Sequence, residues 1–435
     1  MKQLSLVLHS HMPYVEGFGT WPFGEEWLWE AMATSYLPLL EVLDRHPGQV
    51  TVSMTPVLAD QLRADGIGER FLAFMRGVRE ASHRLDREAR PDLVDQLDHS
   101  LTRYRRAART FTRRGGDLVA AFAPHVTWTS SATHAVLPLL ATDAGVRLQV
   151  ETGIASHRER FGDWGGGFWL PECAHAQWLD DRLEAAGVRL TCVELTDLGI
   201  DPRRPLRTAS GVLLAPIDRA VIDLVWGRDG YPSGGAYLDT HALTDRDHLC
   251  WSVDGQPYDP ARAAKRLKVD AVDFLSWVGE RDGGLCVCAL DTELLGHWWS
   301  EGVDWLAAVL DAAPEAGIEI VPLTAEVLES HDPARAPRLP VTTWGSPRTL
   351  ATWSAPAARG LAWQQRAAEL RTLSRPASLR EQRELLALQS SDWAFLITRG
   401  TAGEYPMKRF ERHLAALESR PAEPGLRALA PFLDQ

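Results

Sequence analysis

The chain has 435 residues, of which 45% are hydrophobic and 24% are charged, and its formal net charge is −12 at pH 7. Its length exceeds the ~100 to 200 residues of a typical domain and its composition is that of a protein with a sizeable core, so a single small binding module and a wholly disordered chain are both excluded. The negative charge opposes attraction to phosphate backbones, and we expect no nucleic-acid partner.

The N-terminal segment and the cysteines indicate the cellular compartment. The first apolar run, at 4–8, is too short for a signal peptide. No stretch approaches the ~20 apolar residues of a membrane span, so we expect a cytoplasmic protein that does not bind membranes. The five cysteines include no Cys-x-x-Cys pair and are odd in number, which argues against a zinc knuckle and against a disulfide framework.

Short β-rich segments alternate with helical stretches along the first three quarters of the chain. They occur at 4–8, 50–54, 118–122, 167–170, 189–193, 285–290 and 318–321. Strands that alternate with helices predict a parallel α/β sheet. About seven strands over about 320 residues favour a (β/α) barrel, complete or incomplete, over an open sheet.

Two regions interrupt this alternation. The stretch at about 60–115 is rich in Arg, Glu, Leu and Ala at helical spacing, which predicts a helical insertion after the second strand. The Pro-rich segment at 332–340 indicates a linker. Beyond it, apolar residues recur at three- and four-residue spacing at 357–373, 378–389 and 408–418. We therefore predict a catalytic domain at 1–330 and a C-terminal helical domain at 331–435.

Polar side chains follow three of the predicted strands. His9 and His11 come after the first strand, Glu172 after the fourth, and Asp291 and Glu293 after the sixth. In a parallel barrel the carboxyl ends of all strands share one face, so these side chains should converge. Glu172 and Asp291 are a candidate pair of carboxyls, and about 5 Å between them would suit a retaining glycosidase. Position alone does not decide between Asp291 and Glu293.

Tryptophan is unusually frequent, with 17 residues against 7 Tyr and 12 Phe. Many of these tryptophans fall near predicted loops or beside the polar residues. Flat indole rings pack against the apolar faces of sugar rings and can still donate a hydrogen bond. The sequence therefore predicts a carbohydrate cleft, although any single tryptophan could instead fill the core.

His9 and His11 also allow a different interpretation. Two imidazoles on one strand, with His134 as a third ligand and a distant aspartate, could bind zinc as in metal-dependent deacetylases and some mannosidases. Histidines that hydrogen-bond to sugar hydroxyls explain the pattern equally well. No P-loop or dinucleotide-binding motif is present, so those cofactors are not expected.

Seven motifs occur in a characteristic order over most of the chain. They begin with Leu-His-Ser-His-Met-Pro-Tyr-Val at 8–15, end with Gln-Ser-Ser-Asp-Trp at 389–393, and lie between these at 21–28, 55–59, 132–134, 168–174 and 291–299. In this order they resemble glycoside hydrolase family 57, and within it the α-1,4-glucan branching enzymes. The resemblance implies an α/β fold, an incomplete (β/α)7 barrel with a helical insertion and a C-terminal α-helical domain that closes the cleft.

The resemblance also implies roles for residues. Glu172 would be the nucleophile and Asp291 the acid/base, with no metal and no cofactor, and Glu172 would be ionised and Asp291 protonated before reaction. The substrate would be an α-glucan such as amylose, glycogen or a maltooligosaccharide, and the protein would be a monomer or a small homo-oligomer. Glucan contacts are expected from His9, His11, Trp21, His134, Trp251, Gly255, Trp298, Trp353, Trp363 and Asp392.

One departure from the family concerns the segment after Gly230-Tyr231-Pro232. In branching enzymes a long segment with a mobile loop follows this turn, whereas here the stretch at 232–250 is visibly short. A shorter lid would let water compete with the acceptor sugar. Chain transfer to a 6-hydroxyl is therefore weighed against an α-glucan hydrolase or 4-α-glucanotransferase, and against an inactive glucan-binding protein.

Overall fold

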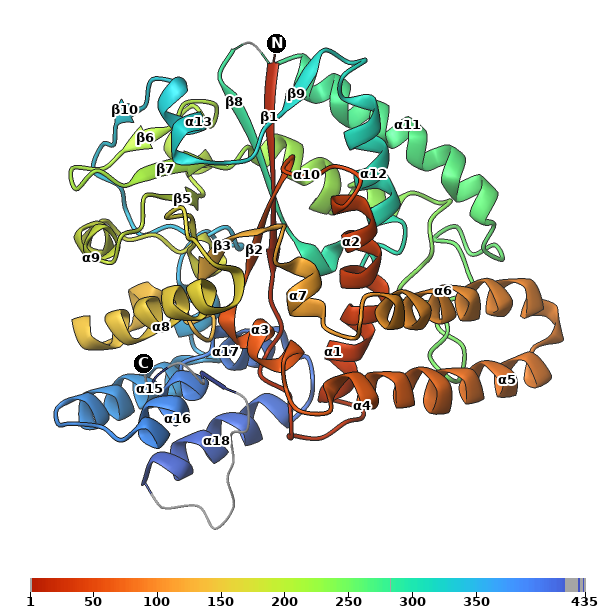
Figure 1. Ribbon diagram of the computed structural model, residues 1–435, viewed down its shortest axis with the longest axis horizontal. Helices are drawn as coiled ribbons and strands as arrows, with labels where there is room; N and C mark the ends of the chain where they lie inside the picture. Colours follow the sequence, from red (N-terminus) through yellow and green to blue (C-terminus); the bar gives the residue numbers. More distant parts are fainter. Residues whose placement is uncertain (1, 282, 419–428, 431–432, 434–435) are drawn as a thin grey trace.

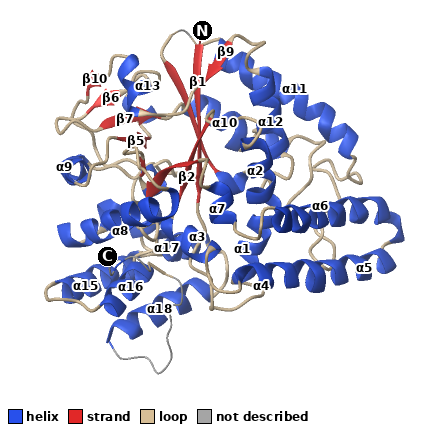
Figure 2. Cartoon of the chain, in the orientation of Figure 1, coloured by secondary structure: helices blue, strands red, loops and turns tan. Residues whose placement is uncertain are grey.

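Parallel strands form the centre of the protein, and the structure, a computed structural model, describes residues 2–281, 283–418, 429, 430 and 433. Seven of the strands follow one another around an incomplete barrel (Figure 1, Figure 2). They are β1 (Lys2–Ser10), β2 (Val50–Met54), β3 (Val126–Ser130), β4 (Phe168–Trp169), β5 (Leu190–Val193), β7 (Leu213–Pro216) and β8 (Leu285–Asp291).

Backbone hydrogen bonds fix the order of these strands. Five of them follow the parallel path β4-β3-β2-β1-β8. Gly167, just before β4, bridges to Leu190 of β5, and β5 pairs in parallel with β7. Between β7 and β8, the N–H of Asp218 donates to the carbonyl of Val287 at 2.8 Å. The prediction of an incomplete (β/α)7 barrel is confirmed.

The central strands form because their sequences are apolar without alternation. Every residue of β1 from Leu4 onward is buried, and β8 is buried from Leu285 to Leu290. Near-continuous apolar runs are typical of parallel strands whose two faces are both covered. The five cysteines are all free and buried, two of them, Cys286 and Cys288, inside β8.

Helices cover the outside of the barrel, and several begin at a capping side chain. Thr142, Asp218, Asp259 and Thr324 each accept a hydrogen bond from a backbone N–H in the first turn of the helix that follows. No helix within the described residues is long and apolar enough to cross a membrane. The covering helices are α1 (Glu25–Ala31), α2 (Leu37–Leu43), α8 (Asp143–Phe161), α9 (Asp180–Ala185), α10 (Arg219–Trp226), α11 (Pro260–Gly279), α12 (Gly302–Ala312) and α13 (Ala325–Ser330).

The chain between β2 and β3 is helical, and the part that contains α5 and α6 projects as a hairpin at the right of Figure 1. Its helices are α3 (Pro56–Leu62), α4 (Ile67–Ala73), α5 (Glu80–Ala89), α6 (Val94–Arg113) and α7 (Leu118–Phe122). The predicted strand at 118–122 is wrong, because this run forms α7. Asp117 caps that helix by accepting from the N–H of Ala120 at 2.9 Å, and the strand begins only at Val126.

The Pro-rich segment packs against the barrel, although we predicted a linker. Its β10 (Ala334–Arg335) pairs with β6 (Leu206–Arg207), which joins β7. The chain then bridges to His175 through Thr342. On the opposite side, β9 (Ile318–Ile320) adds to the first residues of β1. The segment therefore brings the residues near 344 to the carboxyl ends of the strands.

The C-terminal helices lie at the carboxyl ends of the strands, at the lower left of Figure 1. Helices were expected at three places, and α14 and α17 were not foreseen. Arg409 of α18 is buried, donates to the carbonyl of Tyr14 at 2.5 Å and lies 3.6 Å from the ring centre of Phe18, which ties this bundle to the loop after β1. The division into two domains stays a prediction. The helices are α14 (Ala351–Ser354), α15 (Arg359–Leu373), α16 (Leu379–Leu388), α17 (Ser391–Arg399) and α18 (Tyr405–Glu418).

Candidate active site

Three of the predicted histidines come together at the carboxyl ends of the strands. His11 and His134 stack with ring centres 4.0 Å apart, and His9 stacks against His134 at 5.1 Å and against Trp169 at 4.6 Å. His134 adopts a positive φ of 57°, a strained conformation for a residue with a side chain. The structure thus forms a layered wall of imidazole and indole rings.

Serine hydroxyl groups hydrogen-bond to His9 and His134 through one ring nitrogen of each histidine. Nδ1 of His9 lies 3.1 Å from Ser53 Oγ, and Nδ1 of His134 lies 2.9 Å from Ser391 Oγ. The Nε2 atoms of both rings are buried and have no hydrogen-bond partner among the described residues. A buried polar atom without a partner is costly, so these two atoms are suited to bind a ligand that carries hydroxyl groups.

The two buried histidines are neutral, whereas Asp392 is charged. Burial, together with the neighbouring imidazoles, lowers the pKa of His9 and of His134 well below the usual value. Burial opposes ionisation of Asp392, but the electrostatic interaction with His11 and the hydrogen bond between them at 3.0 Å outweigh burial and lower the pKa of Asp392. The C-terminal helices therefore supply the carboxylate that orients His11.

Glu172 lies in a tight turn after β4. The φ angles of Glu172 and Cys173 are 63° and 49°, a strained backbone conformation that the surrounding contacts must maintain. Trp344 fixes the turn twice, since its backbone N–H donates to the Glu172 carbonyl and its Nε1 donates to Glu172 Oε2, both at 3.0 Å. His134 Nδ1 lies 3.9 Å from the other carboxyl oxygen.

Asp291 and Glu293 have different surroundings at the end of β8. Asp291 is opposite His9 in the strand register and is open to solvent at the strand end. Glu293 Oε1 accepts from the backbone N–H of His11 at 3.1 Å and from the Tyr36 hydroxyl at 2.5 Å. No hydrogen bond to the Asp291 carboxyl occurs within the described part of the chain. Glu293 is therefore engaged in holding the loop, and Asp291 remains available.

Both candidate catalytic carboxyls have raised pKa values. Burial and then the charge of Asp291 raise the pKa of Glu172 to about 7, against the hydrogen bond from Trp344. Burial and then the charge of Glu293 raise the pKa of Asp291 to about 7. The Asp291 residue is still exposed to water at the strand end. A bound sugar that excludes this water should therefore raise the pKa of Asp291 further. The sequence predicted desolvation of Asp291 but not of Glu172.

The sequence of the chain matches known carbohydrate-active proteins. The pattern of glycosyl hydrolase family 57 matches residues 127–340, and that of the 1,4-alpha-glucan branching enzyme C-terminal region matches 359–419. A probable 1,4-alpha-glucan branching enzyme of Mycobacterium tuberculosis is 31% identical over 96% of this chain and 90% of its own length. The chain belongs to glycosyl hydrolase family 57.

Solved structures agree with this membership. A family 57 branching enzyme from Pyrococcus horikoshii superposes with a TM-score of 0.87 at 31% identity, over 95% of this chain and 88% of that one. The branching enzyme TK1436 of Thermococcus kodakarensis is 29% identical over 94% of this chain and 72% of its own length. The C-terminal match and these relatives group the chain with the branching-enzyme members of family 57.

Three further residues of the expected family 57 site are exposed. Trp21, Trp298 and Trp363 expose 69%, 53% and 67% of their surfaces. Their rings are thus accessible to a large ligand. Trp298 is fixed near the carboxyls, because its backbone N–H donates to the carbonyl of Glu293 at 3.3 Å. The roles of these three tryptophans stay predictions.

The other expected glucan contacts have different surroundings, and their roles stay predictions. Trp353 is buried in an apolar cluster with Val136, so its ring supports the wall and has no free face for a sugar. Trp251 packs on the helical insertion, where the guanidinium of Arg90 lies 5.3 Å from its ring centre. Gly255 lies in an exposed turn with φ 78° that follows Trp251.

Sequence reasoning missed Trp344 and Tyr36. Trp344 follows no predicted strand and comes after the segment at 332–340 that we took for a linker, so no pattern marked it. Tyr36 lies in a π-helical turn, Met32–Tyr36, between α1 and α2, where a buried aromatic residue is indistinguishable from core. Only the three-dimensional arrangement shows that Trp344 meets Glu172 and that Tyr36 meets Glu293.

The described residues do not form the zinc site that the histidine pattern allowed. Within 2–281, 283–418 and the three later described positions, no group of three or more His, Cys, Asp or Glu side chains is arranged to hold a metal ion. The imidazoles of His9, His11 and His134 are stacked face to face, and converging ligands would instead point their nitrogens at one centre. We therefore derive no step through a metal.

Proposed function

We propose that this protein is a retaining 1,4-α-glucan branching enzyme that cleaves an α-1,4 linkage and transfers the released chain to a 6-hydroxyl. The observation that carries the proposal is the pair Glu172 and Asp291, which lie at the carboxyl ends of β4 and β8 beside neutral histidines, where the charge of Asp291 raises the pKa of Glu172. The activity printed for the relatives above supports the same reaction.

The first step forms a covalent intermediate. The Glu172 carboxylate attacks the anomeric carbon of the donor glucan while the Asp291 carboxylic acid gives its proton to the leaving 4-oxygen. The bond from C1 to that oxygen breaks, and an ester bond from C1 to Glu172 forms. The product that leaves is the shortened chain with a new non-reducing end.

The second step creates the branch. The 6-hydroxyl of an acceptor chain gives its proton to the Asp291 carboxylate and attacks C1, and the ester bond to Glu172 breaks. The new bond is an α-1,6 linkage, and both carboxyls return to their starting states. When water takes the place of the acceptor, the same step yields a hydrolysed chain.

The ionisation of the two carboxyls fits these steps. Two neighbouring acids with raised pKa values hold one proton between them near neutral pH. The Nε1–H of Trp344 donates to the Glu172 carboxylate and so favours its ionised form. The proton is then carried by Asp291. The free Nε2 atoms of His9 and His134 can hydrogen-bond to hydroxyls of the donor sugar without adding charge.

Hydrolysis is the second candidate, and the short segment after Tyr231 favours it. This segment packs on the helical insertion, where Thr244 and Arg246 both donate to the carboxylate of Asp86 and the ring of His248 lies 3.6 Å from that of His83. A segment that is tied down in this way is a poor lid over the cleft, and water then competes with the acceptor.

Linkage analysis of amylose after incubation with the protein tests the proposal. Branching creates α-1,6 linkages without a matching rise in reducing ends, whereas hydrolysis raises reducing ends alone. A 4-α-glucanotransferase changes chain lengths without making α-1,6 linkages. Glu172→Gln and Asp291→Asn are the controls and should form no branches. Binding of amylose without any turnover by the wild type would instead favour an inactive glucan-binding protein.

A further inference from the structure

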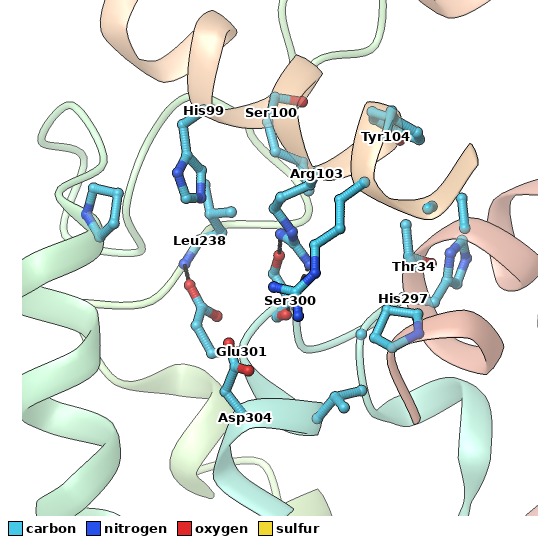
Figure 3. A pocket seen from close by; sticks show the side chains of 18 of the residues that line it. Thr34, His99, Ser100, Arg103, Tyr104, Leu238, His297, Ser300, Glu301 and Asp304 are labelled. Carbon is cyan, nitrogen blue, oxygen red and sulfur yellow. Dashed lines mark hydrogen bonds between the residues drawn. The ribbon is translucent and has the colours of Figure 1, made fainter. Parts of the chain in front are cut away.

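A second cavity lies beside the loop 291–299, which carries Asp291 and contributes Gly296, His297 and Trp298 to the cavity's lining. Its volume is about 650 Å³, within the ~300 to 1,000 Å³ of typical ligand sites and large enough for a short oligosaccharide. Figure 3 shows part of its lining, with Arg103 reaching from α6 toward Ser300 in the loop before α12. The remaining walls come from α1 and α2, the segment at 238–258 and the start of α11.

One motif connects this cavity with the catalytic cleft. The segment 291–299 begins with Asp291 in the cleft and ends with His297 and Trp298, which line the cavity. Its turn is closed by backbone hydrogen bonds from Gly296 to Trp299 and from Trp299 to Leu294, both at 2.8 Å. The lining residues His297 and Trp298 are therefore held at a fixed place relative to Asp291.

The cavity lies on the side of the barrel that carries Asp291. Its lining comes from residues 30–110 and 238–304, and in the described chain no lining residue falls between 111 and 237, the part that contributes His134 and Glu172. In a branching reaction Asp291 takes the proton of the acceptor hydroxyl, so the acceptor chain must approach from the Asp291 side.

The charges of the cavity suit a neutral ligand. Five carboxylates and five cationic side chains line it, so it has no net charge that would select an anion or a cation. Several are already paired, as when Arg79 donates to Glu30 at 2.6 Å and Arg106 donates to Glu41. Fixed donors and acceptors of both kinds beside a half-exposed indole, that of Trp298, are the groups that bind a polyhydroxylated chain.

We propose that this cavity binds the acceptor α-glucan and directs its 6-hydroxyl to Asp291. The inference rests on the proposed branching function and adds a second carbohydrate site to it. The donor chain then occupies the histidine-lined cleft, and the two chains meet at the loop 291–299. Occupation of the cavity favours chain transfer over hydrolysis, because it supplies an acceptor where water would otherwise attack.

Filling the cavity tests this proposal through the fate of the cleaved chain. Ala264 is an exposed residue of α11 that lines the cavity, and its neighbour Lys265 is exposed on the same helix outside the lining. We expect Ala264→Trp to raise the acceptor concentration for half-maximal transfer about tenfold, with hydrolysis of the donor unchanged, and Lys265→Trp to behave as the wild type. Unchanged acceptor dependence in a folded Ala264→Trp protein would overturn the proposal.

Thiol protection gives a second test that does not depend on turnover. Because the native cysteines are all buried, an alkylating reagent should select a new surface thiol. In the Glu172→Gln background, maltoheptaose should slow alkylation of Lys268→Cys, which lines the cavity, at least about fivefold and leave Lys265→Cys unaffected. Equal rates with and without sugar, or equal protection at both positions, would contradict the acceptor site.

The two tests separate this inference from the proposed function. If the wild type forms no α-1,6 linkages but maltoheptaose protects Lys268→Cys, the branching function fails and the glucan site stands. If the wild type branches amylose but neither Ala264→Trp nor the thiol experiment shows an effect, the acceptor site fails and the branching function stands.

Discussion

The catalytic cleft and the second cavity share the loop 291–299, yet they use different kinds of polar groups. In the cleft, burial raises the pKa of the two carboxyls of Glu172 and Asp291, and the neighbouring histidines His9 and His134 are neutral. In the cavity, carboxylates and cations balance and several form ion pairs. A site that moves a proton needs carboxyls whose ionisation can change, whereas a site that only holds a sugar needs fixed charges and dipoles.

The largest expected effect separates Asp291 from Glu293. Asp291→Asn removes the proton donor and should lower the rate of amylose cleavage about a thousandfold or more. Glu293→Gln keeps an acceptor for the N–H of His11 and should cost about tenfold. The comparison is made by steady-state rates of the two variants, with circular dichroism to show that both are folded.

The contrary result for this pair would be a greater loss in Glu293→Gln than in Asp291→Asn. It would reverse the roles that their hydrogen bonds indicate, since Glu293 is held by Tyr36 and His11 while Asp291 is free to react.

A smaller effect concerns the pH profile of the cleft. Glu172 must be ionised to attack, so activity falls as the pH drops through its pKa, which is raised to about 7. The Nε1 hydrogen bond from Trp344 opposes that rise, so Trp344→Phe should raise the pKa further and move the acidic limb of the profile upward by about one pH unit. The measurement is the rate of donor cleavage from pH 4 to pH 9.

The cavity supplies the control for this pH experiment. Lys268 lines the cavity and is not among the groups that shift the pKa of Glu172. Lys268→Ala should therefore leave both limbs of the profile in place. An acidic limb that stays fixed in Trp344→Phe, or that moves equally in Lys268→Ala, would mean that Trp344 does not control the ionisation of Glu172.

The parts of the fold that sequence could predict are those with one dominant signal. The strands at the centre, β1, β2 and β8, are near-continuous apolar runs, and their positions were predicted closely. The run at 118–122 is apolar too, but it is short enough to suit either a strand or a helix. In the structure Asp117 caps this run as a helix, and the strand begins only at Val126.

The site was predictable where it depends on strand ends. Glu172 and Asp291 were singled out because residues that follow parallel strands meet on one face. The pairing of Trp344 with Glu172 depends on a chain that returns from outside the barrel 172 residues later. No periodicity or motif in the sequence indicates that the chain comes back to Glu172 in this way. The pKa of Glu172 also depends on burial and on the hydrogen bond from Trp344, which the sequence does not show.

The most direct test of the account is to trap the glycosyl-enzyme. A 5-fluoroglycosyl fluoride of α configuration reacts readily in the first step and slowly in the second, so the ester should accumulate. Mass spectrometry of the digested protein should find one added glycosyl group on the peptide that contains Glu172, and none in Glu172→Gln. A label on a different residue, or turnover of amylose by Glu172→Gln at the wild-type rate, would contradict the mechanism.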